Sequence, residues 1–334
     1  MKIALITPEH KEDYLTNTII DGLLALAETG DLSWAAPLGY QSYLDFSAHQ
    51  LERTEFVDFA RKADLIFLCW GKDNTNLSLA VEINRFDKTI YVDGSEPGGN
   101  RRYDQVIQAK ILAGDKEIRG AIDRELLAKC SLYFRREQPH PEGIIPLPFG
   151  IERRYLSAYD LDQQKDIDFF CIFGQNEFPP LRAEVQQSLQ KFCQAHNLKC
   201  VTEPTSGFSL SGDKSAGRAE FYQLLARSKV GISVGGGGFD TARFWEILAN
   251  NCLLLTETLA IYEPGSSELA YQRIWQFKDL TEFEQQLEKM ANYLQNEYPK
   301  AMLDLEHQEI LAKHSTRARV EMILAVAKAK HLIL

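Results

Sequence analysis

The chain has 334 residues, of which 45% are hydrophobic and 25% are charged, a composition that is ordinary for a globular protein. This length exceeds that of a usual single core, so we expect two domains. The formal net charge of −10 argues against nucleic acid as a bulk partner, because clustered Lys and Arg hold phosphate backbones. No apolar run reaches the roughly 18–20 residues that span a bilayer, and the N-terminal segment becomes polar too quickly for a signal peptide. We expect a cytoplasmic protein.

The first half alternates short apolar runs with helical patterns. The predicted strands are Lys2–Thr7, Leu32–Pro37, Asp64–Trp70, Thr89–Asp93, Ser131–Phe134 and Ile144–Leu147, and the predicted helices are Tyr14–Glu28, Thr54–Lys62, Arg101–Leu112 and Ile118–Lys129. Such alternation favours parallel strands joined by right-handed helical crossovers. This pattern therefore predicts a Rossmann-like domain over residues 1–150. The domain ends in the segment Pro146–Gly150, which contains prolines and a glycine.

A second strand and helix series starts after this punctuation. Its strands are Asp168–Phe173, Lys199–Glu203, Val230–Val234, Cys252–Thr256 and Ile274–Phe277, and its helices are Leu181–His196, Ala219–Ser228, Thr241–Asn250, Leu280–Asn296, Lys300–His314 and Thr316–His331. We assign residues 151–334 to a second Rossmann-like domain with terminal helices. The predicted fold is α/β, with two Rossmann-like domains facing a cleft.

Four consecutive glycines, Gly235, Gly236, Gly237 and Gly238, follow one predicted strand and precede a helix. Each glycine costs roughly 0.5–1 kcal/mol in regular structure relative to Ala, so the close approach of a ligand is one reason to keep them. Backbone N–H groups and the positive end of the helix dipole meet at such a turn. This arrangement suits a phosphate.

The stretch Ser228–Glu257, with its Arg-x-x-Glu helix before a buried strand, resembles the donor-site signature of GT-B glycosyltransferases of the family 1 type. It is most similar to the spore-maturation-protein-like and exostosin-like branches. Further similarities follow in the expected order: Ser131–Arg136, Leu147–Gly150, Phe173-Gly174 with Arg182, and His314–Arg319.

The resemblance implies a nucleotide-sugar donor whose diphosphate lies near the glycine run, with Gly174, Arg182 and Arg243 nearby. Glu246 matches the glutamate that accepts hydrogen bonds from the ribose hydroxyls, a task that suits a carboxylate. For Arg243, an ion pair with Glu246 on a solvated helix face is the alternative. Many retaining relatives carry a glutamate where this chain has Gly238, so the pattern leaves the stereochemistry open.

A catalytic base for the acceptor hydroxyl is expected on a first-domain loop. The candidates are His10, just after the first strand, and Asp93 and Glu96, just after the fourth. We prefer Asp93, although a turn with solvated carboxylates explains the same residues.

No metal or other cofactor is expected. The six cysteines lie singly and the histidines lack ligand spacing. The triplets Asp160–Asp162 and Asp166–Asp168 lie in a linker and at the start of a strand, so we interpret them as solvated boundary charges. The loop Gly207–Gly217 is interpreted as a surface loop, with a mobile flap as the alternative.

The predicted function is that of a metal-independent glycosyltransferase, of the hexosyltransferase type, that moves a sugar from a nucleotide-diphosphate sugar to a glycan or other hydroxyl acceptor. Two alternatives stay open. One is a nucleotide-sugar epimerase of the same fold, and the other is a non-catalytic nucleotide- or glycan-binding protein. The sequence leaves open the donor sugar, the nucleotide base, the acceptor and the oligomeric state.

Overall fold

The computed structural model describes residues 1–8, 12–30, 32–70, 76–98, 105–160, 162–174, 178–203, 215–258, 261–262, 269–296 and 298–333. The chain forms two compact units. The first consists of Met1–Glu152, Ile261–Ser267 and His314–Leu334, and the second of Arg153–Ala260 and Glu268–Lys313. The break after Glu152 lies two residues beyond the predicted boundary at position 150.

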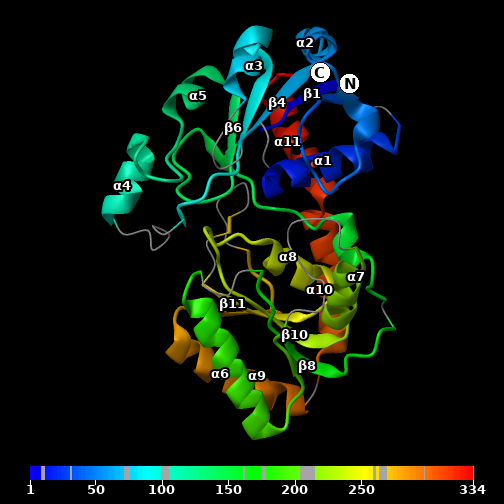
Figure 1. The fold of residues 1–334 in the computed structure, drawn as a ribbon, viewed down its shortest axis with the longest axis vertical. Coiled ribbons are helices and arrows are strands. Elements are labelled where there is room, and N and C mark those ends of the chain that lie inside the picture. Colours follow the sequence, from blue (N-terminus) through cyan, green and yellow to red (C-terminus); the bar gives the residue numbers. More distant parts are fainter. Residues whose placement is uncertain are drawn as a thin grey trace. The chain divides into compact units, whose positions relative to one another are not determined.

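The first unit is built on a parallel sheet, coloured blue to green in Figure 1. Its strands are β1 (Lys2–Ile6), β2 (Ser33–Pro37), β3 (Gln50–Leu51), β4 (Leu65–Trp70), β5 (Thr89–Asp93), β6 (Leu132–Arg135) and β7 (Ile144–Pro146). In the described part of the chain their order is β3-β2-β1-β4-β5-β6-β7, and every pair is parallel. The order reverses direction between β1 and β4, as in doubly wound dinucleotide-binding sheets.

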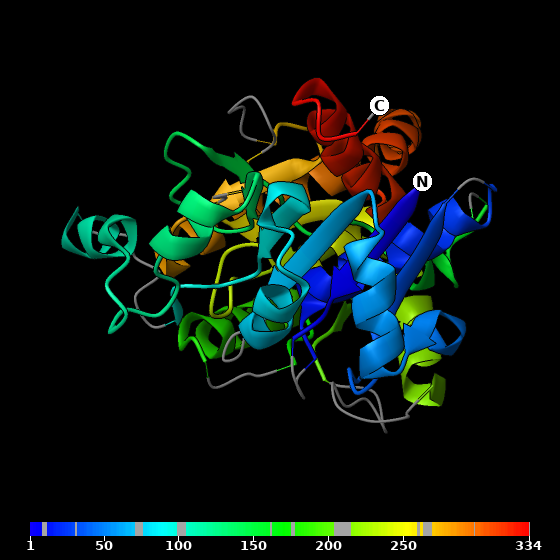
Figure 2. The same cartoon turned by 90° about the horizontal axis from the view of Figure 1, so that it is seen from above.

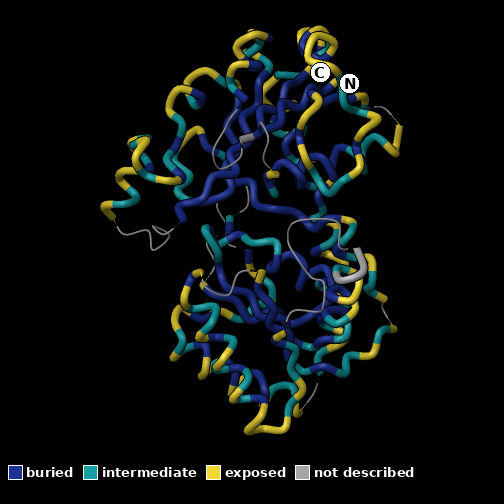
Figure 3. The backbone as a smooth tube through the Cα atoms, viewed as in Figure 1, coloured by how far each residue is buried: buried dark blue, intermediate teal, exposed yellow. Residues whose placement is uncertain are grey.

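Helices cover both faces of this sheet. Apolar side chains of α2 (Arg53–Arg61), α3 (Leu77–Ile83), α4 (Gln105–Ala113) and α5 (Arg124–Lys129) share one core with the strands. The helix α1 (Tyr14–Ala27) packs against β2, β4 and β5 and against the C-terminal helix α11 (Thr316–Ala329). Figure 3 shows the strands as buried and the outer helix surfaces as exposed.

The C-terminal helix α11 belongs to the first unit, whereas we assigned it to the second. Figure 2 shows this red helix beside blue elements of the first unit. The hydroxyl of Thr316 donates to the Asp21 carboxylate at 2.7 Å, and the guanidinium of Arg319 donates to the Phe149 carbonyl at 3.1 Å. Gly22 on α1 faces the first turn of α11 so closely that a Cβ atom there would lie 2.6 Å from Cγ2 of Val320. The contacts of Thr316 with Asp21 and of Val320 with Gly22 join residues almost 300 positions apart, which local sequence patterns cannot indicate.

The second unit contains a second parallel sheet. Its strands are β8 (Ile167–Phe170), β9 (Cys200–Val201), β10 (Ser228–Ser233), β11 (Leu253–Glu257) and β12 (Ile274–Phe277). Within the described residues the order is β12-β11-β10-β8-β9, with parallel pairing throughout. The direction of winding reverses between β8 and β10, so this sheet has its switch point there.

Two layers of helices enclose the second sheet. The helices α6 (Leu181–His196) and α9 (Leu280–Asn296) lie side by side (Figure 1) and share a core with one face of the strands. The helices α7 (Ser215–Ala226) and α8 (Ala242–Ala249) pack on β8, β10 and β11. The helix α10 (Lys300–His314) adds Leu303 to the first of these layers. Gly231 of β10 permits close packing of α8, since a Cβ atom there would lie 2.5 Å from Ile247.

Most predicted elements are present, with two main differences. The predicted helix Ile118–Lys129 begins only at Arg124, because Gly120 has a φ of 78° and the Asp123 carboxylate caps the helix by accepting from the Leu126 N–H. The short elements β3 and α3 were not predicted. Among the described residues, no helix is long and apolar enough to cross a membrane.

We expect Gly22→Ala to lower the free energy of unfolding by about 1–2 kcal/mol. The added methyl group must displace α11, which costs about 1–3 kcal/mol, and this exceeds the roughly 1 kcal/mol by which Ala favours a helix over Gly. Urea unfolding measures the change. An equal or higher stability would contradict the close packing of α1 and α11.

We also expect the protein to lose stability between about pH 6.5 and pH 4. Burial lowers the pKa of His307 to about 4, and its Nε2–H donates to the Ala249 carbonyl at 2.9 Å. Below the ordinary histidine pKa of about 6.5 the unfolded chain takes up a proton that the folded chain excludes, which costs about 1–3 kcal/mol by pH 4. In His307→Gln this pH dependence should shrink, whereas His196→Gln at an exposed site should leave it unchanged. Urea unfolding midpoints at pH 7 and pH 4.5 measure the pH dependence of stability in both variants. The same change in midpoint in His307→Gln as in the wild type would contradict the assignment to His307.

Candidate functional site

The predicted donor-site residues of the second unit gather at the switch point of its sheet. Gly174 follows β8, and the glycine run follows β10, which is the neighbouring strand across the reversal. Ligands of open α/β sheets bind outside the carboxyl ends of the strands at such a reversal. Arg182, Arg243 and Glu246 lie on the helices that begin at this edge. The topology thus brings together the residues predicted for the donor.

The glycine run forms a short turn that is fixed at both ends. The N–H of Gly235 donates to the Glu257 carboxylate at 2.9 Å, and the N–H of Gly236 donates to the Gly238 carbonyl at 2.8 Å. The turn leads into α8, where the Thr241 side chain caps the helix by accepting from the Phe244 N–H. The helix dipole therefore points its positive end at the turn.

Arg182 lies directly beside the glycine turn. Its Nη2 donates to the Val234 carbonyl at 3.1 Å, and its guanidinium lies 5.3 Å from the centre of the Phe173 ring. A Cβ atom at Gly236 would lie 3.1 Å from the same Nη2 atom. A side chain at this position would crowd the arginine, so the absence of one at Gly236 keeps the guanidinium against the turn.

Arg243 and Glu246 form a buried ion pair on α8. Nη1 of Arg243 lies 2.5 Å from Oε2 of Glu246, and the two side chains are 10% and 12% exposed. Nε of Arg243 donates to the Ile172 carbonyl just after β8 at 2.9 Å. Its guanidinium stacks 4.2 Å from the centre of the Phe221 ring on α7. The solvated helix pair that we considered for these residues is therefore wrong, since this pair is buried and ties α8 to β8 and α7.

Glu246 is held by a second donor. The hydroxyl of Tyr222 on α7 donates to its Oε1 at 3.0 Å. Each carboxylate oxygen has two lone pairs, so both retain acceptor capacity for a ligand hydroxyl. This edge therefore combines two guanidinium groups, the N–H groups of Gly237 and Gly238, a helix N-terminus and a carboxylate. Such a set suits a ligand that carries both an anion and hydroxyl groups.

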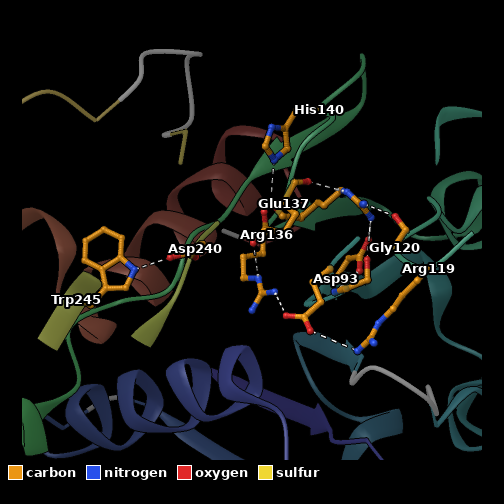
Figure 4. A network of polar contacts seen from close by, with 11 residues as sticks. Asp93, Arg119, Gly120, Arg136, Glu137, His140, Asp240 and Trp245 are labelled. Carbon is orange, nitrogen blue, oxygen red and sulfur yellow. Dashed lines mark hydrogen bonds and ion pairs between the residues drawn. The ribbon is translucent and has the colours of Figure 1, made fainter. Parts of the chain in front are cut away.

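In the first unit Asp93 belongs to a buried polar network (Figure 4). Its carboxylate is 2% exposed and pairs with Nη1 of Arg135. It also accepts from the Tyr133 hydroxyl at 2.6 Å and from the Ser95 N–H at 2.9 Å. Arg135 donates further to the Glu137 carbonyl at 2.8 Å and to the Gly120 carbonyl. This geometry makes Asp93 a structural anchor for the loops at the carboxyl ends of β5 and β6.

Glu96 lies in the same network. One of its oxygens lies 2.9 Å from Nη2 of Arg136, and the other lies 3.4 Å from Nη2 of Arg119. Arg136 also stacks on Phe149, with 4.5 Å to the ring centre. His10 lies outside the described residues, as does most of the loop Gly207–Gly217. The structure therefore brings together Asp93 and Glu96 and leaves their assignment as catalytic residues a prediction.

The triplet Asp166–Asp168 carries ion pairs. Asp166 pairs with Arg227 at 2.7 Å, and Asp168 pairs with Lys229 at 2.7 Å. In the described ranges no three His, Cys, Asp or Glu side chains gather as a metal site. The expectation of chemistry without a metal stays a prediction.

Two residues at this site were missed by the sequence analysis. Glu257 orients the Gly235 N–H, and Tyr222 orients Glu246. The position of Glu257 at the carboxyl end of a buried strand was a usable signal, because polar groups there face the ligand edge of the sheet. Tyr222 lies on a different helix, and no spacing in the sequence connects it to Glu246.

Known proteins share this fold and part of this sequence. Residues 191–325 match the family model described as "Glycosyl transferase-like". An alpha-glucosyltransferase in complex with UDP and a 13-mer DNA has a TM-score of 0.61 at 10% identity, with 98% of this chain and 100% of that chain covered. A glycosyltransferase from Rickettsia africae has a TM-score of 0.61 at 8% identity, with 98% of each chain covered.

Sucrose-phosphate synthase from Thermosynechococcus elongatus is also similar, with a TM-score of 0.53 at 9% identity and 98% of each chain covered. No curated protein sequence is significantly similar to this chain. The similar structures confirm the predicted fold of two parallel-sheet α/β domains. Together with these structures, the match over residues 191–325 indicates similarity to glycosyl transferase-like proteins of this fold.

We expect Asp93→Asn to lower the free energy of unfolding by about 3–5 kcal/mol, because it leaves the Arg135 guanidinium buried without a counter-charge. Asp87→Asn, at a carboxylate that is 67% exposed, should change it by less than about 1 kcal/mol. Thermal and urea unfolding measure both variants. If Asp93→Asn instead kept full stability and lost only turnover, Asp93 would be the base and not the anchor.

Proposed function

We propose that the protein transfers a sugar from a nucleoside-diphosphate sugar to an acceptor hydroxyl and that the second unit binds the donor. The observation that carries this proposal is the position of the glycine turn, Arg182 and the Arg243–Glu246 pair at the switch point of the second sheet. The glycosyl transferase-like match spans these residues except Arg182. The likeness to an alpha-glucosyltransferase solved with UDP supports a nucleoside diphosphate as the ligand.

The chemistry follows from the charges at this edge. When the bond between the sugar and the diphosphate breaks, negative charge develops on the leaving phosphate. The Gly235 and Gly236 N–H groups are bonded within the protein. Positive charge is supplied by the N–H groups of Gly237 and Gly238, the N-terminus of α8 and the guanidinium groups of Arg182 and Arg243. We therefore propose that these groups take the place of a metal ion. Glu246, oriented by Tyr222, is proposed to accept hydrogen bonds from the ribose hydroxyls.

The range of acceptors that the proposal allows is wider than the range that the sequence analysis predicted. The negative net charge predicted that nucleic acid is no partner, but a protein of the same fold was solved with DNA, so that exclusion is not supported. Net charge averages over the whole surface and does not describe one site. We propose an acceptor hydroxyl on a glycan, and keep the spore-maturation-like and exostosin-like branches within this proposal because the motifs occur in their order.

We expect UDP to bind the wild-type protein and Glu246→Gln to weaken that binding by about tenfold to a hundredfold, because hydrogen bonds to a charged group contribute about 1.5–3 kcal/mol. Gly236→Ala should weaken it as well, since its methyl group crowds Arg182 and leaves the Arg243–Glu246 pair intact. Titration calorimetry measures both variants.

Glu184→Gln, at an exposed position in the first turn of α6, is the matched control and should bind UDP as the wild type does. If neither UDP nor any other nucleoside diphosphate binds the wild type, the donor site is wrong. Product analysis with a nucleotide sugar but without acceptor separates transfer from epimerisation, because only an epimerase converts the sugar of the donor itself.

A further inference from the structure

Two cysteine side chains meet at the edge of the second sheet. Cys193 lies in the last turn of α6, and Cys200 begins β9, the strand at the edge of the described sheet next to β8. The helix ends at Asn197, whose φ of 53° lies in the left-handed region. The Cys193 carbonyl accepts from the N–H groups of both Asn197 and Leu198. Such an end stops the helix and changes the direction of the chain, which brings Cys200 back to the side of Cys193.

The two thiols are in contact with each other. The Cys193 thiol donates a hydrogen bond to the sulfur of Cys200. Both side chains also belong to the apolar cluster that contains Phe169 and Val185, and both are free thiols. Sulfur atoms within hydrogen-bond reach need only a short approach to the disulfide bond length of about 2 Å. The fold therefore presents these two cysteines as a pair.

The members of the pair differ in access. Cys193 is 1% exposed, whereas Cys200 is partly exposed. The pair lines a surface pocket of about 520 Å³, together with Gln190, Gln194 and Lys199. Cys200 is thus the member that a small reagent in this pocket can reach, and Cys193 lies behind it.

The hydrogen bond also gives the two sulfurs different reactivity. It lowers the pKa of the Cys200 thiol below its ordinary value and raises the pKa of Cys193, which keeps its proton. The thiolate is the nucleophilic form of a cysteine. The more accessible cysteine is therefore also the more nucleophilic one.

We propose that Cys200 is a site of oxidation by hydrogen peroxide and that Cys193 converts the oxidised form into a disulfide. In the first step the Cys200 thiolate attacks one peroxide oxygen and the O–O bond breaks. Cys200 becomes a sulfenic acid, and the hydroxide that leaves takes a proton from solvent. In the second step the Cys193 sulfur attacks the Cys200 sulfur and the S–O bond breaks. The hydroxyl group leaves as water with the proton of the Cys193 thiol.

This modification goes beyond the proposed transfer reaction, because neither cysteine belongs to the proposed donor site. The disulfide would join the end of α6 to the edge strand β9. A thiol reductant would reverse it by exchange.

The test treats the full chain with hydrogen peroxide and maps its cysteines by mass spectrometry without prior reduction. We expect two peptides joined through Cys193 and Cys200, lighter by two hydrogen atoms than the reduced pair and separated again by dithiothreitol. At pH 7, iodoacetamide should alkylate Cys200 at least about tenfold faster than Cys130. Cys130 is also partly exposed, but burial raises its pKa to about 12.

Two variants separate the roles of the two sulfurs. Cys193→Ala should slow the reaction of Cys200 with peroxide, because it removes the hydrogen bond that lowers the pKa of Cys200. It should also stop the reaction at the sulfenic acid, which dimedone labels. Cys200→Ser should abolish both the cross-link and the dimedone adduct. Cys130→Ser is the matched control and should form the cross-link at the wild-type rate.

Mapping of the wild-type chain decides the question even if a variant fails to fold. The inference is overturned if the wild type, shown to be folded by circular dichroism, forms no cross-link between Cys193 and Cys200. It is also overturned if Cys130 reacts as fast as Cys200. A cross-link from Cys200 to the buried Cys171 in place of Cys193 would equally contradict it.

Discussion

Arg243 holds the carboxyl edge of the second sheet together. Its guanidinium group donates to the carbonyl that follows β8, pairs with Glu246 on its own helix and stacks on Phe221 of α7. A buried arginine is tolerated only when its charge and its N–H groups are satisfied, so β8, α7 and α8 must keep their relative positions. The glycine turn lies between β10 and α8, so its geometry depends on this arrangement.

The first unit also contains a buried arginine that pairs with a carboxylate, but the surroundings of that carboxylate differ. Arg135 is fully buried and binds the Asp93 carboxylate and the carbonyl of Gly120, which joins the carboxyl ends of β5 and β6 to the segment between α4 and α5. There the carboxylate is saturated by donors and enclosed. In the second unit Glu246 keeps some exposure and spare acceptor capacity. The difference in exposure and in the number of donors separates a structural ion pair from one that is suited to a ligand.

Local patterns in the sequence predicted the two sheets and the gathering of the donor residues, because alternation of apolar strands with helices fixes a parallel sheet and its carboxyl edge. They did not predict the burial of the Arg243–Glu246 pair. The spacing of three residues is that of a surface pair, but Arg243 to Ala249 are all buried. The burial of Asp93 was missed for the same reason, since its partner Arg135 lies 42 positions away. The placement of α11 depends on Gly22, almost 300 positions earlier.

The two ends of α8 connect the carboxyl edge of the second sheet with its amino edge. The helix is capped by Thr241, next to the glycine turn, and by Asn250, shortly before β11. It rises about 1.5 Å per residue, so its eight residues span about 12 Å. Because seven of these residues are buried, the helix cannot shift without repacking the core around it. The position of the glycine turn is therefore set by a rigid element, so the edge at which we propose that the donor binds is already formed.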